Sequence, residues 1–216
     1  GGFIDVTGDQ FLQLLFDGLL FGVMIALAAL GLNLVFGTTG LTNFSHGDLV
    51  TLGAFTALLL NLVGVHLVIA APIAVVFCAI VFGWGQNRVL WRPLRRRKTG
   101  LIAMMIISIG LAIVFRYTVA LFFGAAPQTY KQYAGQSGIS LGPVTATPKA
   151  LILAVLAIIT LVVVVIWVQR SRIGKATRAV SDNPALASAT GIDVEKVISV
   201  VWIVSAGLAA FAGIYL

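Results

Sequence analysis

The stretch Arg170–Ile192, which reads RSRIGKATRAVSDNPALASATGI, decides how the rest of the chain is interpreted. It is the longest polar interval with an apolar run close on both sides, 150–168 before it and 194–216 after it. Backbone groups of a polar segment would find no partners in hydrocarbon, so the segment must leave the lipid unless protein covers it. The stretch is therefore expected to connect two membrane spans.

The second half of this stretch predicts a short helix at about 184–190, lying at the membrane face. Asn183 followed by Pro184 is a typical helix start, because Asn caps the first amides and Pro suits the first turn. Gly191 is a typical helix end. The alternative is a capped turn with no role beyond joining the two spans.

The composition indicates one integral membrane domain, 1–216. Of the 216 residues 60% are hydrophobic and 10% charged, and the mean hydropathy is +1.07, whereas soluble domains carry about 25% charged residues. Apolar runs recur along the whole chain, so a signal peptide does not explain them. Cys78 is the single cysteine and lies in an apolar run, which excludes an intrachain disulfide. The net charge of +7 does not indicate a nucleic-acid partner, because the basic residues cluster between apolar runs.

Six apolar segments have the length or composition of membrane helices, which need about 20 residues to cross the hydrocarbon. The fold class is therefore an all-α polytopic membrane protein. The second segment is short and is expected to span only part of the bilayer. Because the chain starts with Gly rather than Met and ends inside an apolar run, further spans are expected beyond its C-terminus. The six segments are 11–36, 47–63, 67–87, 101–123, 150–169 and 194–216.

The basic residues predict the orientation. The interval 88–98 holds six Lys or Arg and 170–178 holds four, of 14 in the chain. Two spans separate these intervals, so both lie on one side, and the positive-inside rule assigns that side to the cytoplasm. The interval 124–149, with two lysines, and the acidic N-terminal arm are then outside. The outer interval is either a plain loop or a surface that receives an external partner.

Arg116 is an unusual charge, about two-thirds of the way along its span from the cytoplasmic end. Charged residues inside a membrane are costly and face protein or water. We expect Arg116 to have a structural partner or to extend to the outer interface. The alternative is a role in a transport path.

Residues 37–48, GTTGLTNFSHGD, predict a break between two helices. They separate two apolar runs without any Lys or Arg, unlike an ordinary cytoplasmic loop. Broken helices in transporters place half-helix ends near the substrate. Ser45 or Asn43 is expected to cap the next helix, with Asp48 in its first turn. The alternative is a capped turn at the membrane edge.

Three stretches resemble the permease subunits of ABC importers for branched-chain amino acids. The first is the polar loop with Gly174, Arg178, Ala179, Asn183, Ala187, Gly191 and Ile192. The second is GLNLVFGTTGLTNFSHGDLVTLGAF, with Asn43, Phe44, His46 and Gly47 on the family pattern, and the third is ISIGLAIVFRYTVALFFG, 107–124. Ser45 stands where the family often has Ala, and Asp48 where it often has Glu.

The resemblance implies a bacterial inner-membrane permease with no covalent chemistry of its own. Its partners would be ATP-binding subunits docking on 170–192, a second permease subunit in a heterodimer, an external substrate-binding protein and membrane lipid. The implied coupling residues are Gly174, Arg178, Asp182, Asn183, Ala187 and Gly191. We further expect a translocation path at Asn43, Phe44, Ser45, His46 and Asp48.

Motifs for other functions are absent from the sequence. It has no Walker A motif, since Gly174-Lys175 is followed by Ala176, so ATP hydrolysis would belong to a partner. It has no HExxH or GxSxG motif, and no catalytic residue, metal site or cofactor is expected. Three alternatives stay open: a permease for urea or short amides, a solute channel without an ATPase, and an intramembrane enzyme.

Overall fold

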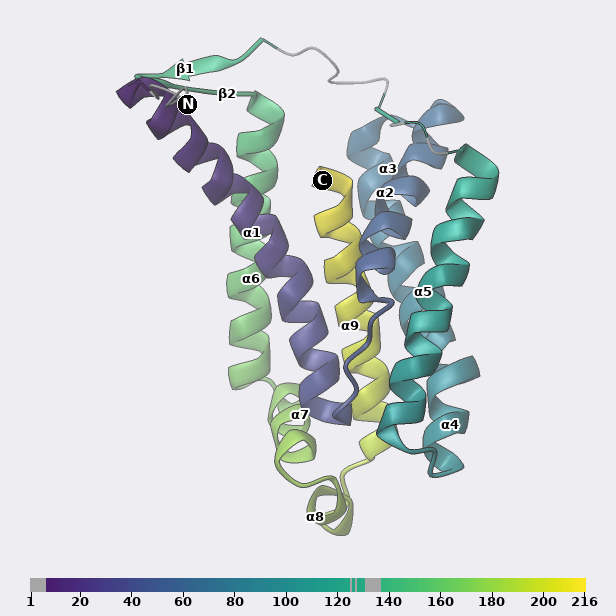
Figure 1. The fold of residues 1–216 in the computed structure, drawn as a ribbon. Helices are drawn as coiled ribbons and strands as arrows, with labels where there is room; N and C mark the ends of the chain where they lie inside the picture. Colours follow the sequence, from purple (N-terminus) through teal and green to yellow (C-terminus); the bar gives the residue numbers. More distant parts are fainter. Residues whose placement is uncertain (1–6, 125, 127, 131–136) are drawn as a thin grey trace, which may run out of the picture.

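The computed structural model describes residues 7–124, 126, 128–130 and 137–216 and forms a bundle of long helices (Figure 1). Within these residues, five helices are long and apolar enough to cross a membrane, and α2 is a shorter apolar helix. This confirms the predicted all-α polytopic membrane protein and its short second span. The long helices are α1 (Gly8–Thr39), the continuous helix 67–96, α5 (Leu101–Phe123), α6 (Pro148–Arg170) and α9 (Val194–Tyr215); α2 covers His46–Leu62.

The third span continues further than the sequence indicated. It was expected to end at 87, but helical structure runs on to Arg96. Arginine and lysine are good helix formers, so the basic residues continue the helix instead of ending it. Lys98 then ends it with a φ of 53°. The helix consists of α3 (Leu67–Cys78), the π-helical segments η1 (Ala79–Gly85) and η2 (Asn87–Trp91), and α4 (Arg92–Arg96).

The helix α9 is the centre of the bundle. Two-thirds of its most apolar window (67%) is buried, against 6–28% for the other long helices. In Figure 1 it lies between α1 and α6 on one side and α2, α3 and α5 on the other. It packs with α1 and α6 through one apolar cluster that includes Met24, Ala157 and Leu208.

Glycines allow the neighbouring helices to approach the α9 backbone closely. A Cβ on Gly53 of α2 would overlap Ala210, and one on Gly213 of α9 would overlap the carbonyl of Val50. A Cβ on Gly83 of η1 would lie 2.7 Å from the carbonyl oxygen of Trp202. Such contacts are typical of helices that pack in lipid. Several elements therefore meet α9 at backbone distance.

A small hairpin covers one end of α1. Strands β1 (Ile139–Leu141) and β2 (Val144–Ala146) pair antiparallel, and this hairpin was not expected from the sequence. Gln13 of α1 accepts from the amide of Thr145 at 2.8 Å and donates to its carbonyl at 2.9 Å. Figure 1 places the hairpin at the end of the bundle opposite α7 and α8. Asp5 and Lys131, which the sequence assigned to the outer side, lie outside the described residues.

Tyr130 fixes the interval between α5 and α6 to α2. Its hydroxyl donates to the carbonyl of Ala54 at 3.2 Å. Burial raises the pKa of the Tyr130 phenol to about 12, because the phenolate would lose its hydration. The phenol therefore keeps its donor proton at every physiological pH.

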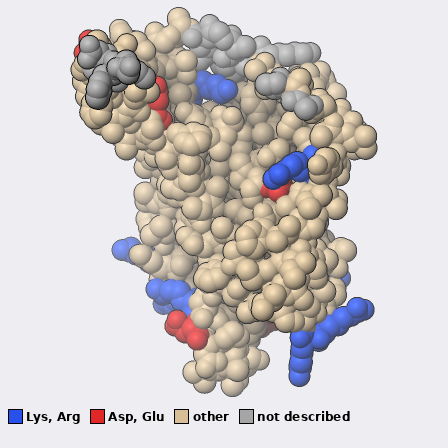
Figure 2. All heavy atoms as spheres, viewed as in Figure 1, with Lys and Arg blue, Asp and Glu red and all other residues tan. Residues whose placement is uncertain are grey.

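The basic residues gather at the end of the bundle that carries α4 and α7. Figure 2 shows most of the Lys and Arg on this face at that end, with a largely uncharged surface above it. This arrangement brings the two basic intervals to one side, as the positive-inside argument requires. Their assignment to the cytoplasm stays a prediction.

We predict that Gly213→Ala destabilises the bundle and Gly22→Ala does not. The new Cβ at 213 overlaps the backbone of Val50, whereas at 22 nothing lies within 4 Å. Overpacking typically costs about 1–3 kcal/mol, so the Gly213→Ala protein should melt at a lower temperature in detergent. Equal melting temperatures of the two variants would contradict the assigned packing of α9.

We also predict that position 175 is cytoplasmic and position 140 external. Single cysteines at these exposed positions, in a Cys78→Ser background, would be treated in intact cells with an impermeant thiol reagent. Only the cysteine at 140 should react, and the one at 175 should react after the cells are permeabilised. Labelling of 175 alone in intact cells would reverse the topology.

Candidate functional site

The polar interval that joins α6 and α9 contains two helices, α7 (Arg172–Asp182) and α8 (Pro184–Ala189). The predicted helix at 184–190 is confirmed as α8 to within one residue. The helix α7 was not predicted, although its residues carry a helical period. Gly174, Thr177 and Val180, three residues apart, form its buried face.

The turn from α6 into α7 depends on Gly174. Its amide donates to the Ser171 hydroxyl at 2.8 Å, and a Cβ would overlap the carbonyls of Trp167 and Val168. Arg178 donates from Nη2 to the carbonyl of Gln169 at 3.1 Å. Two predicted coupling residues therefore hold the shape of the turn. Gly174 is buried, and Arg178 keeps an exposed surface.

The helix α8 has the predicted cap and stop. The Asn183 side chain accepts from the amide of Leu186 at 3.0 Å, and Gly191 has a φ of 88°. Ala187 is buried in a cluster with Val180 and Val197, which fixes α8 against α7 and α9.

The helix α8 exposes a large apolar side chain, with exposed polar residues beside it. Figure 1 shows α8 as the element furthest from the β1–β2 hairpin. Leu186 is 63% exposed there, and Asp182 and Asn183 beside it are also exposed. Leu186 was not predicted from the sequence as a site residue. The available signal was a leucine next to Ala187 on a short helix. Neighbouring positions on a helix point in different directions, so a helix that buries Ala187 leaves Leu186 on another face.

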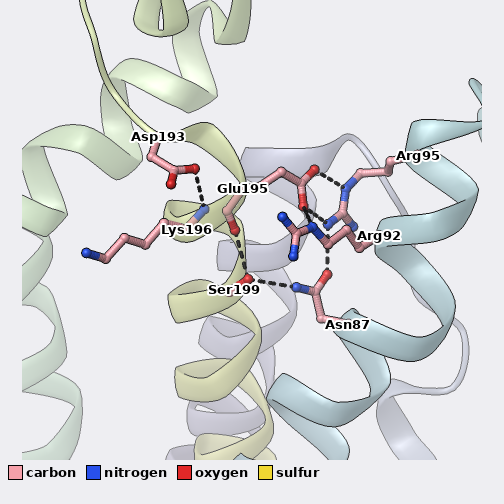
Figure 3. Close-up of polar contacts among 7 residues, drawn as sticks. All are labelled: Asn87, Arg92, Arg95, Asp193, Glu195, Lys196 and Ser199. Atoms are coloured by element: carbon pink, nitrogen blue, oxygen red, sulfur yellow. Dashed lines mark hydrogen bonds and ion pairs between the residues drawn. The ribbon is translucent and has the colours of Figure 1, made fainter.

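A polar network ties the start of α9 to the helix that ends in α4 (Figure 3). Glu195 accepts from Arg95 Nη2 at 3.0 Å and lies 3.4 Å from Arg92 Nε. Arg95 also donates to the Asn87 side-chain oxygen at 2.8 Å, and Asn87 donates to the Ser199 hydroxyl at 3.0 Å. These contacts hold α9 to α4 close to the point where α8 leads into it.

This network was not predicted from the sequence, although Glu195 is the only glutamate in the chain. An acid at the start of an apolar span, on the same side as a run of six basic residues, was the available signal. Which of the six basic residues face the acid depends on how helix 67–96 is turned about its axis. That rotation is set by tertiary packing, including the stacking of Trp91 on Trp202, whose ring centroids are 5.6 Å apart.

The second candidate segment is the break between α1 and α2. Residues 40–45 leave the end of α1 and rise beside α9 to the start of α2 within the bundle (Figure 1). Side chains satisfy part of this non-helical backbone. The amide of Phe44 donates to the Ser108 hydroxyl of α5 at 3.0 Å, and the amide of Ser45 to Asn43 Oδ1 at 3.2 Å. The segment is thus a break inside the bundle and not a turn at its edge.

The expected cap of α2 differs in detail. Ser45 occupies the N-cap position but makes no capping hydrogen bond with its side chain. Its hydroxyl instead donates to Asn43 Oδ1 at 2.7 Å. Asn43 accepts from both groups of Ser45, so the pair stabilises the turn before the helix. Both residues are buried.

The side chains of His46 and Phe44 differ in exposure. His46 is buried, and its Nε2 lies 2.8 Å from the carbonyl oxygen of Ala28, which links α2 to α1. Phe44 is 50% exposed. Of the five predicted path residues, Phe44 alone has an exposed side chain. Asn43, Ser45 and His46 make hydrogen bonds within the protein, but Asn43 Nδ2 and His46 Nδ1 are buried without a partner among the described residues.

Asp48 in the first turn of α2 faces Arg116 of α5. The distance from Asp48 Oδ1 to Arg116 Nε is 3.5 Å. The expected structural partner of Arg116 is therefore Asp48. Among the described residues no group of three or more His, Cys, Asp or Glu could hold a metal ion.

Comparisons with known proteins agree with these features. The family model of the branched-chain amino acid transport system permease component matches residues 14–216. The high-affinity branched-chain amino acid transport system permease protein LivH of Salmonella typhimurium is 32% identical over 95% of this chain and 70% of its own length. The corresponding protein BraD of Pseudomonas aeruginosa is 27% identical over 96% of this chain and 71% of its own. No solved structure matches the chain significantly.

We predict that Glu195→Gln loosens the start of α9. Arg95, whose side chain is 15% exposed, would lose its carboxylate partner, and an unsatisfied buried group costs about 1–3 kcal/mol. Amide hydrogen exchange at 193–199 should become faster. The matched control is Lys196→Gln, because the Lys196 side chain points away from the network (Figure 3). Equal exchange in the two variants would show that the network does not hold α9.

Proposed function

Because this chain belongs to the branched-chain amino acid transport permease family, we propose that it forms the membrane pathway of an ABC importer for branched-chain amino acids. The observation that carries the proposal is the capped helix α8, held by α7 at the basic end of a multi-pass bundle. A permease powered by a separate ATPase requires a rigid element at that place.

The ATP-binding subunit docks on α8 and the adjoining turn. Leu186, which is 63% exposed, supplies an apolar contact, and Asp182 and Asn183 supply polar contacts around it. An exposed apolar anchor with a polar rim is the usual composition of a binding hot spot. Gly174, Arg178, Ala187 and Gly191 act indirectly, by giving the segment its shape.

The start of α9 carries the motion of this segment into the bundle. Ala187 contacts Val197, and Glu195 connects α9 to α4 two residues earlier. Further along α9, Ala206 and Ala209 pack on Leu49, next to Asp48 at the break. The residues 43–48 form part of the path: Phe44 is exposed, Asp48 faces Arg116, and the buried Asn43, Ser45 and His46 hold the break between the helices.

The remaining partners follow from the same function. The basic end faces the cytoplasm of a bacterial inner membrane, and the hairpin end meets an external binding protein that delivers the substrate. A second permease subunit completes the pathway. The sparsely buried α5, with 6% of its window buried, offers a surface for that subunit.

The test is ATP-dependent uptake of leucine by the permease reconstituted with its ATP-binding, second permease and binding-protein subunits. We expect Leu186→Arg to release the ATP-binding subunit and to reduce uptake about tenfold or more, since losing an interface hot spot costs at least about 2 kcal/mol. Pull-down of the ATP-binding subunit from the same membranes would measure docking.

The matched control is Leu141→Arg, an exposed leucine on the opposite hairpin, which should leave the ATP-binding subunit bound. Release by both variants would indicate general misfolding. Full docking and full uptake with Leu186→Arg would overturn the assigned docking surface. Uptake of urea or amides in place of leucine by the unaltered complex would overturn the substrate class.

A further inference from the structure

We infer that Asp48 and Arg116 together form a weak binding site for the charged groups of a free amino acid. Asp48 receives the ammonium group and Arg116 the carboxylate. This inference rests on the proposed function and names the residues that would recognise the backbone of the substrate. Broken helices in transporters place half-helix ends near the substrate, whereas here two side chains bind its charged groups.

The position of the pair within the bundle supports this assignment. Asp48 lies in the first turn of α2, which begins inside the bundle, and Arg116 lies seven residues before the end of α5 at Phe123. At 1.5 Å per residue, Arg116 is about 10 Å below the outer end of its helix. The pair is thus at membrane depth and on the outer half of the route across it.

The exposure of the two partners is strongly unequal. The Asp48 side chain is 9% exposed, whereas the Arg116 side chain is 73% exposed. A guanidinium facing hydrocarbon would be costly, so its open side should face water or polar groups. The Nε atom of Arg116 faces Asp48. The other N–H donors of the guanidinium lie in one plane, and their geometry fits the two oxygens of a carboxylate. This matches a passage between subunits better than a lipid-facing surface.

Among the described residues at 44–48, only the backbone amide of Gly47 lacks a partner, and the other four amides of the break are already engaged. Those of Phe44, Ser45 and His46 donate to Ser108, Asn43 Oδ1 and the Asn43 carbonyl. The amide of Asp48 donates to the carbonyl of Ser45. A substrate carboxylate would have to displace these bonds, whereas it could approach the exposed side of Arg116 directly. The guanidinium is therefore the better donor for it.

The charges also favour a weak site. With no substrate the two side chains neutralise each other at 3.5 Å. A zwitterion inserted between them would replace one ion pair by two, without changing the net charge of the path. The separation of the side chains offsets part of that gain, so the substrate would be released readily. Phe44, exposed four residues before Asp48, offers an apolar surface for an aliphatic side chain.

The test is ligand-observed saturation-transfer NMR on the assembled transporter in nanodiscs, without the binding protein. The probes are leucine, leucine amide, which lacks the carboxylate, and 4-methylpentanoate, which lacks the ammonium. Arg116→Gln should weaken leucine and 4-methylpentanoate about tenfold and spare leucine amide, because it removes a charge-assisted hydrogen bond. Asp48→Asn should weaken leucine and leucine amide and spare 4-methylpentanoate. Arg116→Lys, which keeps the charge, should retain most of the carboxylate binding.

The control variant is Arg96→Gln, an exposed arginine at the basic end, which should bind all three probes as the unaltered protein does. Leucine binding unchanged by both site variants, or an equal loss of all three probes, would overturn the inference, as would no leucine signal in a transporter that takes up leucine. Uptake by the unaltered complex, measured on the same preparation, separates the outcomes. Normal uptake with the wrong probe pattern overturns this site only, and absent uptake overturns the proposed function.

Discussion

Close backbone contact around α9 is the constraint on which the rest of the structure depends. In lipid no hydrophobic effect drives helices together, so association relies on packing and on polar contacts. Gly53 and Gly213 bring α2 against α9, and Gly83 brings η1 against it. With those helices at backbone distance, the polar groups on them are aligned with partners. The pairs Asn87–Ser199 and Arg95–Glu195 depend on that alignment.

The break between α1 and α2 shows how the bundle accommodates non-helical backbone. An unpaired amide in hydrocarbon costs several kcal/mol, so irregular segments require partners from neighbouring elements. Ser108 of α5 supplies one partner and Asn43 another. The contact of His46 with the carbonyl of Ala28 then holds the new helix to α1. These side chains permit a polar element at membrane depth, and the same geometry positions Asp48 opposite Arg116.

The two candidate sites are joined by one helix. The start of α9 contacts α8 and α4, and the middle of α9 packs on the first turns of α2. A rigid helix in contact at both places can transmit a displacement without any local unfolding. The central, buried position of α9 thus serves its packing and also places it in contact with both candidate sites.

Local features of the sequence were sufficient to predict much of the structure of this protein. Apolar runs of membrane length determined the spans, because lipid leaves the backbone few other solutions. Asn183, Pro184 and Gly191 determined α8, because a cap, a first-turn proline and a left-handed stop act within a few residues. The resemblance of three stretches to a family of permeases was confirmed by similarity over nearly the whole chain.

The tertiary structure decided the pairings. Glu195 with Arg95, and Asp48 with Arg116, are 100 and 68 residues apart, and their meeting depends on how each helix is turned about its axis. The same holds for Ser108, whose partner is an amide in another element. Small residues face several sides of α1, α2 and α9, so the sequence did not distinguish the face that packs. The glycine contacts around α9 together select the packing face of each helix. Each close contact is possible in only one rotation of its helix about its axis.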